Sequence, residues 1–340
     1  MANFLASNLV QAQALVNAQF NSPELRAQQT PILNLGNKNT ETLIPSHKTL
    51  IGREDRPLEA YIVKRTRRDA TGKTRAYRHT GDFGDSEAVD ILFAPFADTF
   101  KMSLKLLDNN MYDSVAMLAN KLSQSCMNIR ESIEAYLADW LMAQKTQVNV
   151  ATQNGTWNGT THAFEIISLL ERGLLFEDAK SMMRQNFYTG GYDVIADPKM
   201  YRDAAYYANQ GAGNASNLAF QFSGMSVVES VTISDTNYSQ GMALFLPTNS
   251  FGVLNWIPPA NIAGYGSDMH SYNGFLSTFV DPVTGMTYAL SAYEDRADTS
   301  SVNGNAQDFV MEFELSVDVS PVLAPLSTAN ESVVFQVARV

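Results

Sequence analysis

The sequence contains a single cysteine, Cys126, among 340 residues. One thiol cannot form an intrachain disulfide or supply the ligands of a Cys-rich zinc site. Cys126 stands in a helical pattern among core-type neighbours, so we expect an inert, buried side chain. No two histidines stand at metal-ligand spacing among His47, His79, His162 and His270. We therefore predict no metal, no cofactor and no catalytic residue, and the chain is not expected to be an enzyme.

Long apolar runs are also missing. No stretch approaches the roughly 18 consecutive apolar residues of a membrane-spanning helix, and the first residues lack the basic segment of a signal peptide. We expect a protein that folds in a reducing cytoplasm and does not enter a membrane. Gly72-Lys73-Thr74 resembles the end of a phosphate-binding loop, but Arg67 stands where that loop needs glycine.

Charge is sparse and mostly negative. Charged residues make up 17% of the chain and the net charge is −11. A protein that binds nucleic acid over its whole surface is excluded, because phosphate affinity needs clustered Lys and Arg. The apolar fraction of 45% is that of a globular chain. Residues 1–48, rich in Asn and Gln, predict a short helix near Leu5–Phe20 followed by an extended arm.

Residues 58–80 predict a β-hairpin that turns at Asp69–Gly72 and leaves through Thr74–Tyr77. It carries seven of the chain's 24 basic residues: Lys64, Arg65, Arg67, Arg68, Lys73, Arg75 and Arg78. Between Lys64 and Arg78 the one acidic residue is Asp69, so the rest of the chain holds 17 basic and 34 acidic residues. Such a segment can contact nucleic acid, dock on an acidic surface of a neighbouring copy, or stay solvated. We favour docking, because copies of one chain supply both signs of charge.

A long helix is predicted over residues 111–147, roughly 50 Å at 1.5 Å per residue. Apolar residues recur there at intervals of three and four: Val115, Leu118, Leu122, Cys126, Ile129, Ile133, Leu137 and Trp140. A coiled coil is disfavoured because there is no strict heptad. Candidate acidic partners for the basic hairpin on this helix are Glu131, Glu134 and Asp139.

The remaining chain predicts a mixture of helices and strands. Helices are expected over Thr161–Arg172, Phe176–Gln185 and Lys199–Gln210, the last capped by Asp197 and opened by Pro198. Strands are expected at Val89–Phe93, Phe100–Leu104, Tyr192–Ala196, Gly224–Ser230, Phe309–Val319 (ending at Pro321) and Val333–Val337. A turn at Asp281–Gly285 should join two strands.

This order of elements resembles the major capsid protein of tailed double-stranded DNA phages, which has the HK97-type fold. The resemblance lies in the arm, the projecting hairpin, the single long helix and the segment Tyr192–Gly211. It implies an α+β fold with an N-terminal arm (1–48), an E-loop hairpin (49–88), a peripheral domain with the spine helix (89–159), an axial domain (160–275) and peripheral strands (276–340).

The resemblance also implies partners. It implies hexamers and pentamers in an icosahedral shell, a separate scaffolding protein, a portal and possibly a decoration protein. It further implies packaged DNA that is not bound sequence-specifically, and a place in the virion after assembly in the host cytoplasm. Some members of the family crosslink Lys to Asn of a neighbour, for which Lys64 or Lys73 could supply the amine.

Three alternatives remain open. An encapsulin-like compartment would have the same fold with a protein cargo. Tail tube and head decoration proteins are also phage structural proteins, but they rarely need so long an internal helix. An enzyme would need a residue constellation that the sequence does not display.

Overall fold

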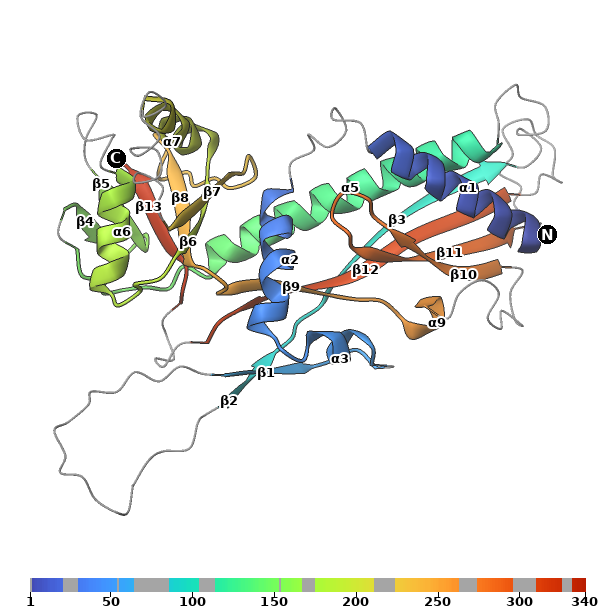
Figure 1. The fold of residues 1–340 in the computed structure, drawn as a ribbon, viewed down its shortest axis with the longest axis horizontal. Helices are drawn as coiled ribbons and strands as arrows, with labels where there is room; N and C mark the ends of the chain where they lie inside the picture. Colours follow the sequence, from blue (N-terminus) through green and yellow to red (C-terminus); the bar gives the residue numbers. More distant parts are fainter. Residues whose placement is uncertain are drawn as a thin grey trace, which may run out of the picture.

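The computed structural model describes residues 2–20, 30–53, 55–63, 86–103, 114–152, 154–166, 175–210, 224–262, 274–295, 310–325 and 332–340. Two sheets lie at opposite ends of an elongated molecule, and one long helix runs between them (Figure 1). A small two-stranded sheet stands apart from both. The α+β class expected from the sequence is confirmed.

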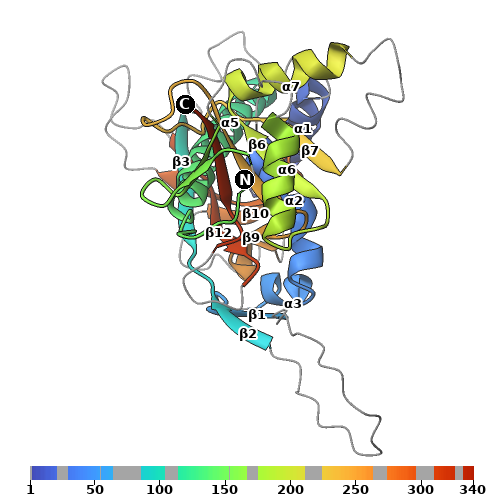
Figure 2. The same ribbon diagram turned by 90° about the vertical axis from the view of Figure 1, so that its left-hand side faces the viewer.

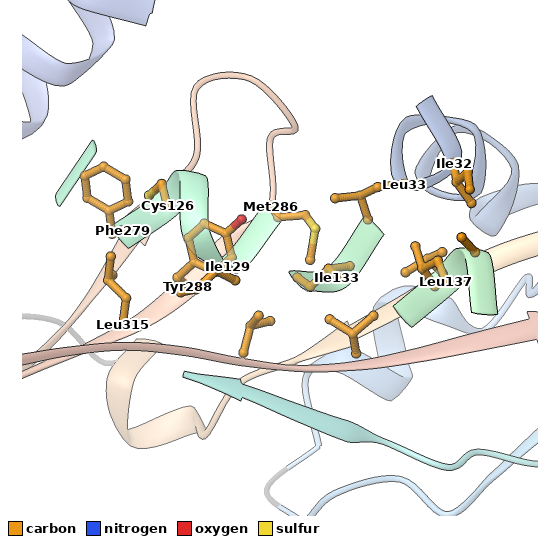
Figure 3. Close-up of a cluster of buried hydrophobic side chains, with 14 of the residues drawn as sticks. Ile32, Leu33, Cys126, Ile129, Ile133, Leu137, Phe279, Met286, Tyr288 and Leu315 are labelled. Carbon is orange, nitrogen blue, oxygen red and sulfur yellow. The ribbon is translucent and has the colours of Figure 1, made fainter. Parts of the chain in front are cut away.

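The long helix is α5 (Ser114–Ala143), with 30 residues, or about 45 Å. Its stripe is buried from Val115 to Leu137, as the spacing predicts. Figure 3 shows Ile129 beside Tyr288 and Met286 of the neighbouring sheet, whereas Ile32 lies farther along the helix, near Leu137. The helix ends at Ala143 and not at residue 147 as predicted, and the predicted start at residues 111–113 lies outside the described part.

The first sheet has the antiparallel order β10-β11-β12-β3, and β9 pairs with the far end of β12. Its strands are β3 (Ala94–Ser103), β9 (Phe251–Trp256), β10 (Gly274–Val280), β11 (Thr287–Asp295) and β12 (Val310–Leu323). The alternating pattern of β12 is confirmed. The strand does not end at Pro321 as predicted, since Pro321 pairs with Val253. The last residue of β12 that pairs with β3 is Val319, which lies opposite Ala94. Pro321 stands beyond that pair, where its missing N–H group leaves no β3 carbonyl without a donor.

The second sheet has the order β4-β5-β13-β8-β6-β7. Its strands are β4 (Thr156–Asn158), β5 (Ala163–Ile166), β6 (Tyr192–Ala196), β7 (Met225–Glu229), β8 (Met242–Pro247) and β13 (Phe335–Arg339), with helices α6 (Leu175–Gln185) and α7 (Pro198–Gln210) beside them. The predicted cap is confirmed, because the Met200 N–H donates to Asp197 Oδ1 at 2.7 Å.

Three expectations for this part of the chain are corrected. Residues 163–166 are a strand rather than part of a helix over 161–172, and residues 167–174 lie outside the described part. Strand β13, grouped by sequence with the peripheral strands, lies between β5 and β8 in the second sheet. Strand β9, grouped with the axial domain, belongs to the first sheet. Both strands find partners far away in the chain, which local sequence does not encode.

The N-terminal region is helical where it is described. Helix α1 (Ala2–Phe20) packs along α5 and buries Leu9, Ala12 and Val16. Helices α2 (Pro31–Leu43) and α3 (His47–Ile51) follow, and a short α9 (Pro259–Ile262) lies after β9. These helices correct the expectation of an extended segment up to residue 48. Helix α2 is stable because it packs on β9 and α5. These two elements supply the apolar contacts that the segment cannot make within itself.

Helix α2 connects both ends of the molecule. The Ile32 and Leu33 N–H groups donate to the two Glu134 oxygens of α5 at 3.0 Å each. Asn39 Nδ2 donates to Asp193 Oδ2 of β6 at 3.0 Å. The Val253 N–H of β9 donates to Thr40 Oγ1 at 2.9 Å. One helix is thereby bound to the spine helix and to both sheets.

Replacing Gly36 of α2 with alanine is expected to lower the free energy of unfolding by about 1–3 kcal/mol. A Cβ there would lie 2.3 Å from Val253 Cγ2 and 3.0 Å from Phe251 Cε1, so α2 would have to move off β9. Urea unfolding of the unassembled chain measures this loss. Gly190→Ala is the control, because its Cβ would meet nothing within 4 Å. Equal stability of the two variants would contradict the close packing of α2 on β9.

Candidate functional site

The small sheet is a two-stranded ribbon of β1 (Glu59–Val63) and β2 (Ser86–Asp90). The strands are antiparallel, with pairs that run from Glu59↔Asp90 to Val63↔Ser86. In both views the ribbon lies at one margin of the molecule, beyond both larger sheets (Figure 1 and Figure 2). The hairpin expected over residues 58–80 is corrected here, because the partner of residues 59–63 is 86–90.

The inner face of the ribbon is fixed to the body of the protein. Ala60 and Ile62 are buried in a cluster with α3, β9 and β12 that includes Leu50, Leu254 and Val322. This alternation follows from the period of two residues in a strand. The ribbon therefore has a defined position relative to the first sheet.

The chain just before the ribbon is also anchored. Arg56 forms an ion pair with Asp318 of β12 at 2.5 Å, and its guanidinium lies 5.7 Å from the centre of the Trp256 ring. Trp256 Nε1 donates to the Arg53 carbonyl oxygen at 3.3 Å. These contacts join the start of β1 to β9 and β12.

The outer face of the ribbon is open. By strand parity it carries Glu59 and Tyr61 from β1 and Asp90 from β2. Tyr61 is 63% exposed, and Leu58 and Leu92, which flank the Glu59↔Asp90 end of the ribbon, are 73% and 78% exposed. Large apolar side chains this exposed, gathered at one place, are typical of an interaction surface.

A groove of about 1000 Å³ lies beside this face, between α3 and β1. Its lining includes Pro45, Thr49, Arg53, Leu58 and Tyr61. The ribbon thus presents both a flat face and an adjacent hollow to whatever binds it.

The basic residues predicted to dock lie outside the described residues: Lys64, Arg65, Arg67, Arg68, Lys73, Arg75 and Arg78. The turn expected at 69–72 also lies outside them. The structure does describe the two ends of this segment, because Val63 and Ser86 are paired. The basic segment therefore begins and ends at the distal end of the ribbon.

The three acidic candidates on α5 separate into two kinds. Glu131 and Asp139 are exposed. Glu134 is 1% exposed, and both of its oxygens accept hydrogen bonds from α2. Burial raises the pKa of Glu134 to about 7, although the N–H groups of Ile32 and Leu33 act in the opposite direction. Glu134 is thus a link inside the subunit and is no longer a candidate for contacting another copy.

A second polar cluster joins the end of α5 to the second sheet. Lys145 Nζ lies 3.1 Å from Asp235 Oδ2, and Gln336 Nε2 of β13 donates to the same oxygen at 3.1 Å. Burial alone would raise the pKa of Asp235, but the hydrogen bonds from Asn237, Gln336 and Lys145 lower it overall. This cluster fixes the second sheet to the spine helix.

Two features were sought and not found in the described part of the chain, a cluster of metal ligands and a membrane-spanning helix. Within it, no group of three or more His, Cys, Asp or Glu side chains could hold a metal ion. Nor does any helix found in the described ranges have the length and apolarity to span a bilayer. Cys126 is fully buried. Burial is the main cause that raises the pKa of its thiol, and the nearby Asp281 carboxylate raises it further, as expected of an inert thiol.

Glu59, Asp90, Tyr61 and Leu92 were not among the predicted contact residues. The available signal was strand parity, which places Glu59 and Tyr61 on the face opposite Ala60 and Ile62. The pairing of Glu59 with Asp90 could not be read from the sequence, because it depends on the register between strands far apart in the chain.

No protein-family model and no curated protein sequence matches the chain. Solved structures are similar to it at low identity. The capsid structure of the cyanophage P-SCSP1u has 11% identity and a TM-score of 0.44, with 84% of each chain covered. A structure of Mycobacterium phage Bobi has 10% identity and a TM-score of 0.43, covering 86% of this chain and 89% of that one. The mature capsid of bacteriophage PhiM1 has 12% identity and a TM-score of 0.42, covering 84% and 83%.

Proposed function

We propose that this protein is a structural protein of a phage virion, and that its copies self-assemble into the icosahedral head shell around double-stranded DNA. The observation that supports this most directly is the ribbon β1–β2. Its inner face is fixed to the body, its outer face is open, and its distal end leads into a segment with seven basic residues. An open face that carries large apolar side chains is typical of a surface that contacts another molecule.

The rest of the molecule suits the same function. The spine helix, bound through α2 and the Lys145 cluster to both sheets, makes a stiff body on which a projection can be held in place. Closed shells need identical subunits that meet through unlike surfaces in hexamers and pentamers. The net charge of −11 would keep packaged DNA from adhering to the shell, so we expect no sequence-specific DNA contact.

The wider assembly follows from this function. Scaffolding, portal and decoration proteins would be the partners, and assembly would take place in the host cytoplasm. Catalysis is not part of the proposal, and Lys64 or Lys73 remains a candidate only for a crosslink to a neighbour's Asn. Both lie in the basic segment that would approach another copy. The second candidate function is an encapsulin-like compartment, which would use the same ribbon but enclose protein.

Electron microscopy of the expressed protein tests the proposal. The chain should be expressed alone and together with its neighbouring genes, and the lysate examined by negative stain. Closed shells, or rings of five and six copies, are expected. Shells filled with DNA would support the phage head, and shells filled with protein would support the compartment. A monomer in every co-expression would contradict both.

Changing Arg65, Arg67 and Arg68 together to Glu is expected to abolish shells while the monomer stays folded. Reversing three charges in the basic segment replaces attraction to an acidic neighbour with repulsion, which costs several kcal/mol per contact. Sedimentation and circular dichroism measure assembly and folding separately. The control is the triple change to Lys at the same positions, which keeps the charge and should assemble. Normal shells from the Glu variant would refute docking by the basic segment.

A further inference from the structure

Strand β13 carries a glutamine amide inside the core of the second sheet. All five residues of the strand are buried, and Gln336 is completely so. An amide in such a place is costly unless its polar atoms are bonded. The amide oxygen accepts a hydrogen bond from Lys145 Nζ at 2.5 Å, and the amide nitrogen donates to Asp235 Oδ2 at 3.1 Å.

These three side chains form a closed triangle of contacts. The Asp235 oxygen that accepts from Gln336 also lies 3.1 Å from Lys145 Nζ. The side chains of Lys145 and Asp235 are only 11% and 10% exposed, so water has little access to them. An amine, a carboxamide and a carboxylate are the groups that amide exchange between two side chains needs. They supply the nucleophile, the carbonyl carbon with its leaving nitrogen, and a carrier for the protons.

The amine lies close to the carbon that it would attack. Gln336 Cδ is bonded to Oε1 through a C=O bond of about 1.2 Å, so Lys145 Nζ lies within about 3.7 Å of Cδ. Reacting atoms held about 3–3.5 Å apart react far faster than free groups, because the entropy of bringing them together has already been lost. The burial of Gln336 also keeps water from competing with the amine for the carbon.

We propose that Lys145 and Gln336 form an isopeptide bond within one copy of the chain, with Asp235 as the group that transfers the protons. The bond from Nζ to Cδ forms, and the bond from Cδ to Nε2 breaks. Of the three protons on the Lys145 ammonium, one stays on the new amide. The other two pass through the carboxylate to Nε2, which leaves as ammonium. Asp235 ends ionised as it began, and the exchange uses no oxidant, reductant or cofactor.

The bond joins two parts of the chain that are 191 positions apart. Lys145 follows the end of α5, and Gln336 lies in β13, between β5 and β8. A covalent link across so long a loop restricts the unfolded chain, so it holds the second sheet to the spine helix when noncovalent contacts loosen. The bond lies inside a single copy. It therefore goes beyond the proposed function and does not depend on assembly.

Mass spectrometry of the denatured chain tests the proposal. The wild type is expected to be about 17 Da lighter than its sequence, which is the mass of one ammonia. Trypsin should then fail to cut after Lys145, and a branched peptide should join residues 131–172 to residues 297–339. The branched peptide is the deciding readout, because an Asn-Gly pair such as Asn154-Gly155 can lose ammonia by closing on its own backbone.

Two variants should abolish the bond. Lys145→Arg keeps the positive charge, but its guanidinium does not attack an amide. Asp235→Asn keeps a side chain of the same shape that still accepts a hydrogen bond, but it does not carry a proton. Both are expected to have the full mass of their sequences and no branched peptide. Lys38→Arg is the matched control, because Lys38 is an exposed lysine of α2, and this variant should keep the loss of ammonia.

The wild-type result decides the bond even if a variant fails to fold, which circular dichroism would reveal. Wild-type protein of full mass, with residues 131–145 and 297–339 as separate peptides, overturns the proposal and leaves the cluster as an ion pair. A branched peptide in folded Asp235→Asn overturns the role of the carboxylate. Wild-type chains that carry the branched peptide but form no shells would refute the proposed function and leave the bond standing.

Discussion

Replacing Asp281 with alanine is expected to lower the free energy of unfolding by about 3–5 kcal/mol. Asp281 lies at the turn between β10 and β11 and is completely buried, as is Arg130 of α5. Arg130 Nε lies 3.6 Å from Asp281 Oδ2. Removing the carboxylate takes a counter-charge away from a buried guanidinium in a medium of low dielectric constant. Chemical unfolding of the monomer measures the loss.

The same carboxylate also organises its turn, so the experiment needs to separate two causes. The Val283 N–H donates to Asp281 Oδ1 at 3.0 Å, and Thr284 Oγ1 donates to Oδ2 at 2.6 Å. The double variant Arg130→Met with Asp281→Asn removes both charges and keeps a polar acceptor in the turn. It should recover most of the stability lost in Asp281→Ala. Equal instability of the two variants would assign the loss to the turn instead of the ion pair.

Glu134 is expected to make the stability of the monomer depend on pH between about 4.5 and 7. Its pKa is about 7 in the folded chain, against 4.5 for an ordinary glutamate. A carboxyl whose pKa is raised by folding stabilises the fold fully below the ordinary pKa. That contribution is lost as the pH rises through the folded pKa. At 1.36 kcal/mol per pKa unit, the change is about 3 kcal/mol.

The measurement compares wild type with Glu134→Gln over this pH range. The glutamine variant loses the same stability at every pH, because its amide nitrogen cannot accept a hydrogen bond from the N–H group of Ile32 or Leu33. The stability advantage of the wild type should therefore shrink by about 3 kcal/mol as the pH rises from 4.5 to 7. Glu131→Gln, one turn away on the exposed side of α5, controls for the loss of one carboxylate. A constant advantage across the range would refute the coupling.

Features encoded by neighbouring residues were predictable. The stripe of α5 repeats at three and four residues, so the sequence alone indicates a long helix with one buried face. Asp197 and Pro198 specify the start of α7 by local capping chemistry. The alternation in β12 likewise indicates one buried and one open face.

Features that depend on distant partners were not predictable. Helix α2 is polar and contains Gly36, and its first N–H groups are bound by a residue 102 positions away. One signal was present, because Arg130 and Glu134 stand four apart on the apolar side of α5, where charges need buried partners. Even so, the identity of those partners depends on how the chain folds back.

The position of β13 has a consequence for protein synthesis. All five residues of this strand are buried, and it joins β5 from the middle of the chain to β8. Until residue 339 has left the ribosome, β5 and β8 have no strand between them. The second sheet therefore cannot close before β13 has been synthesised, and long-range pairing of this kind is slow. A nascent chain that has not yet reached β13 leaves the facing edges of β5 and β8 without their partner strand.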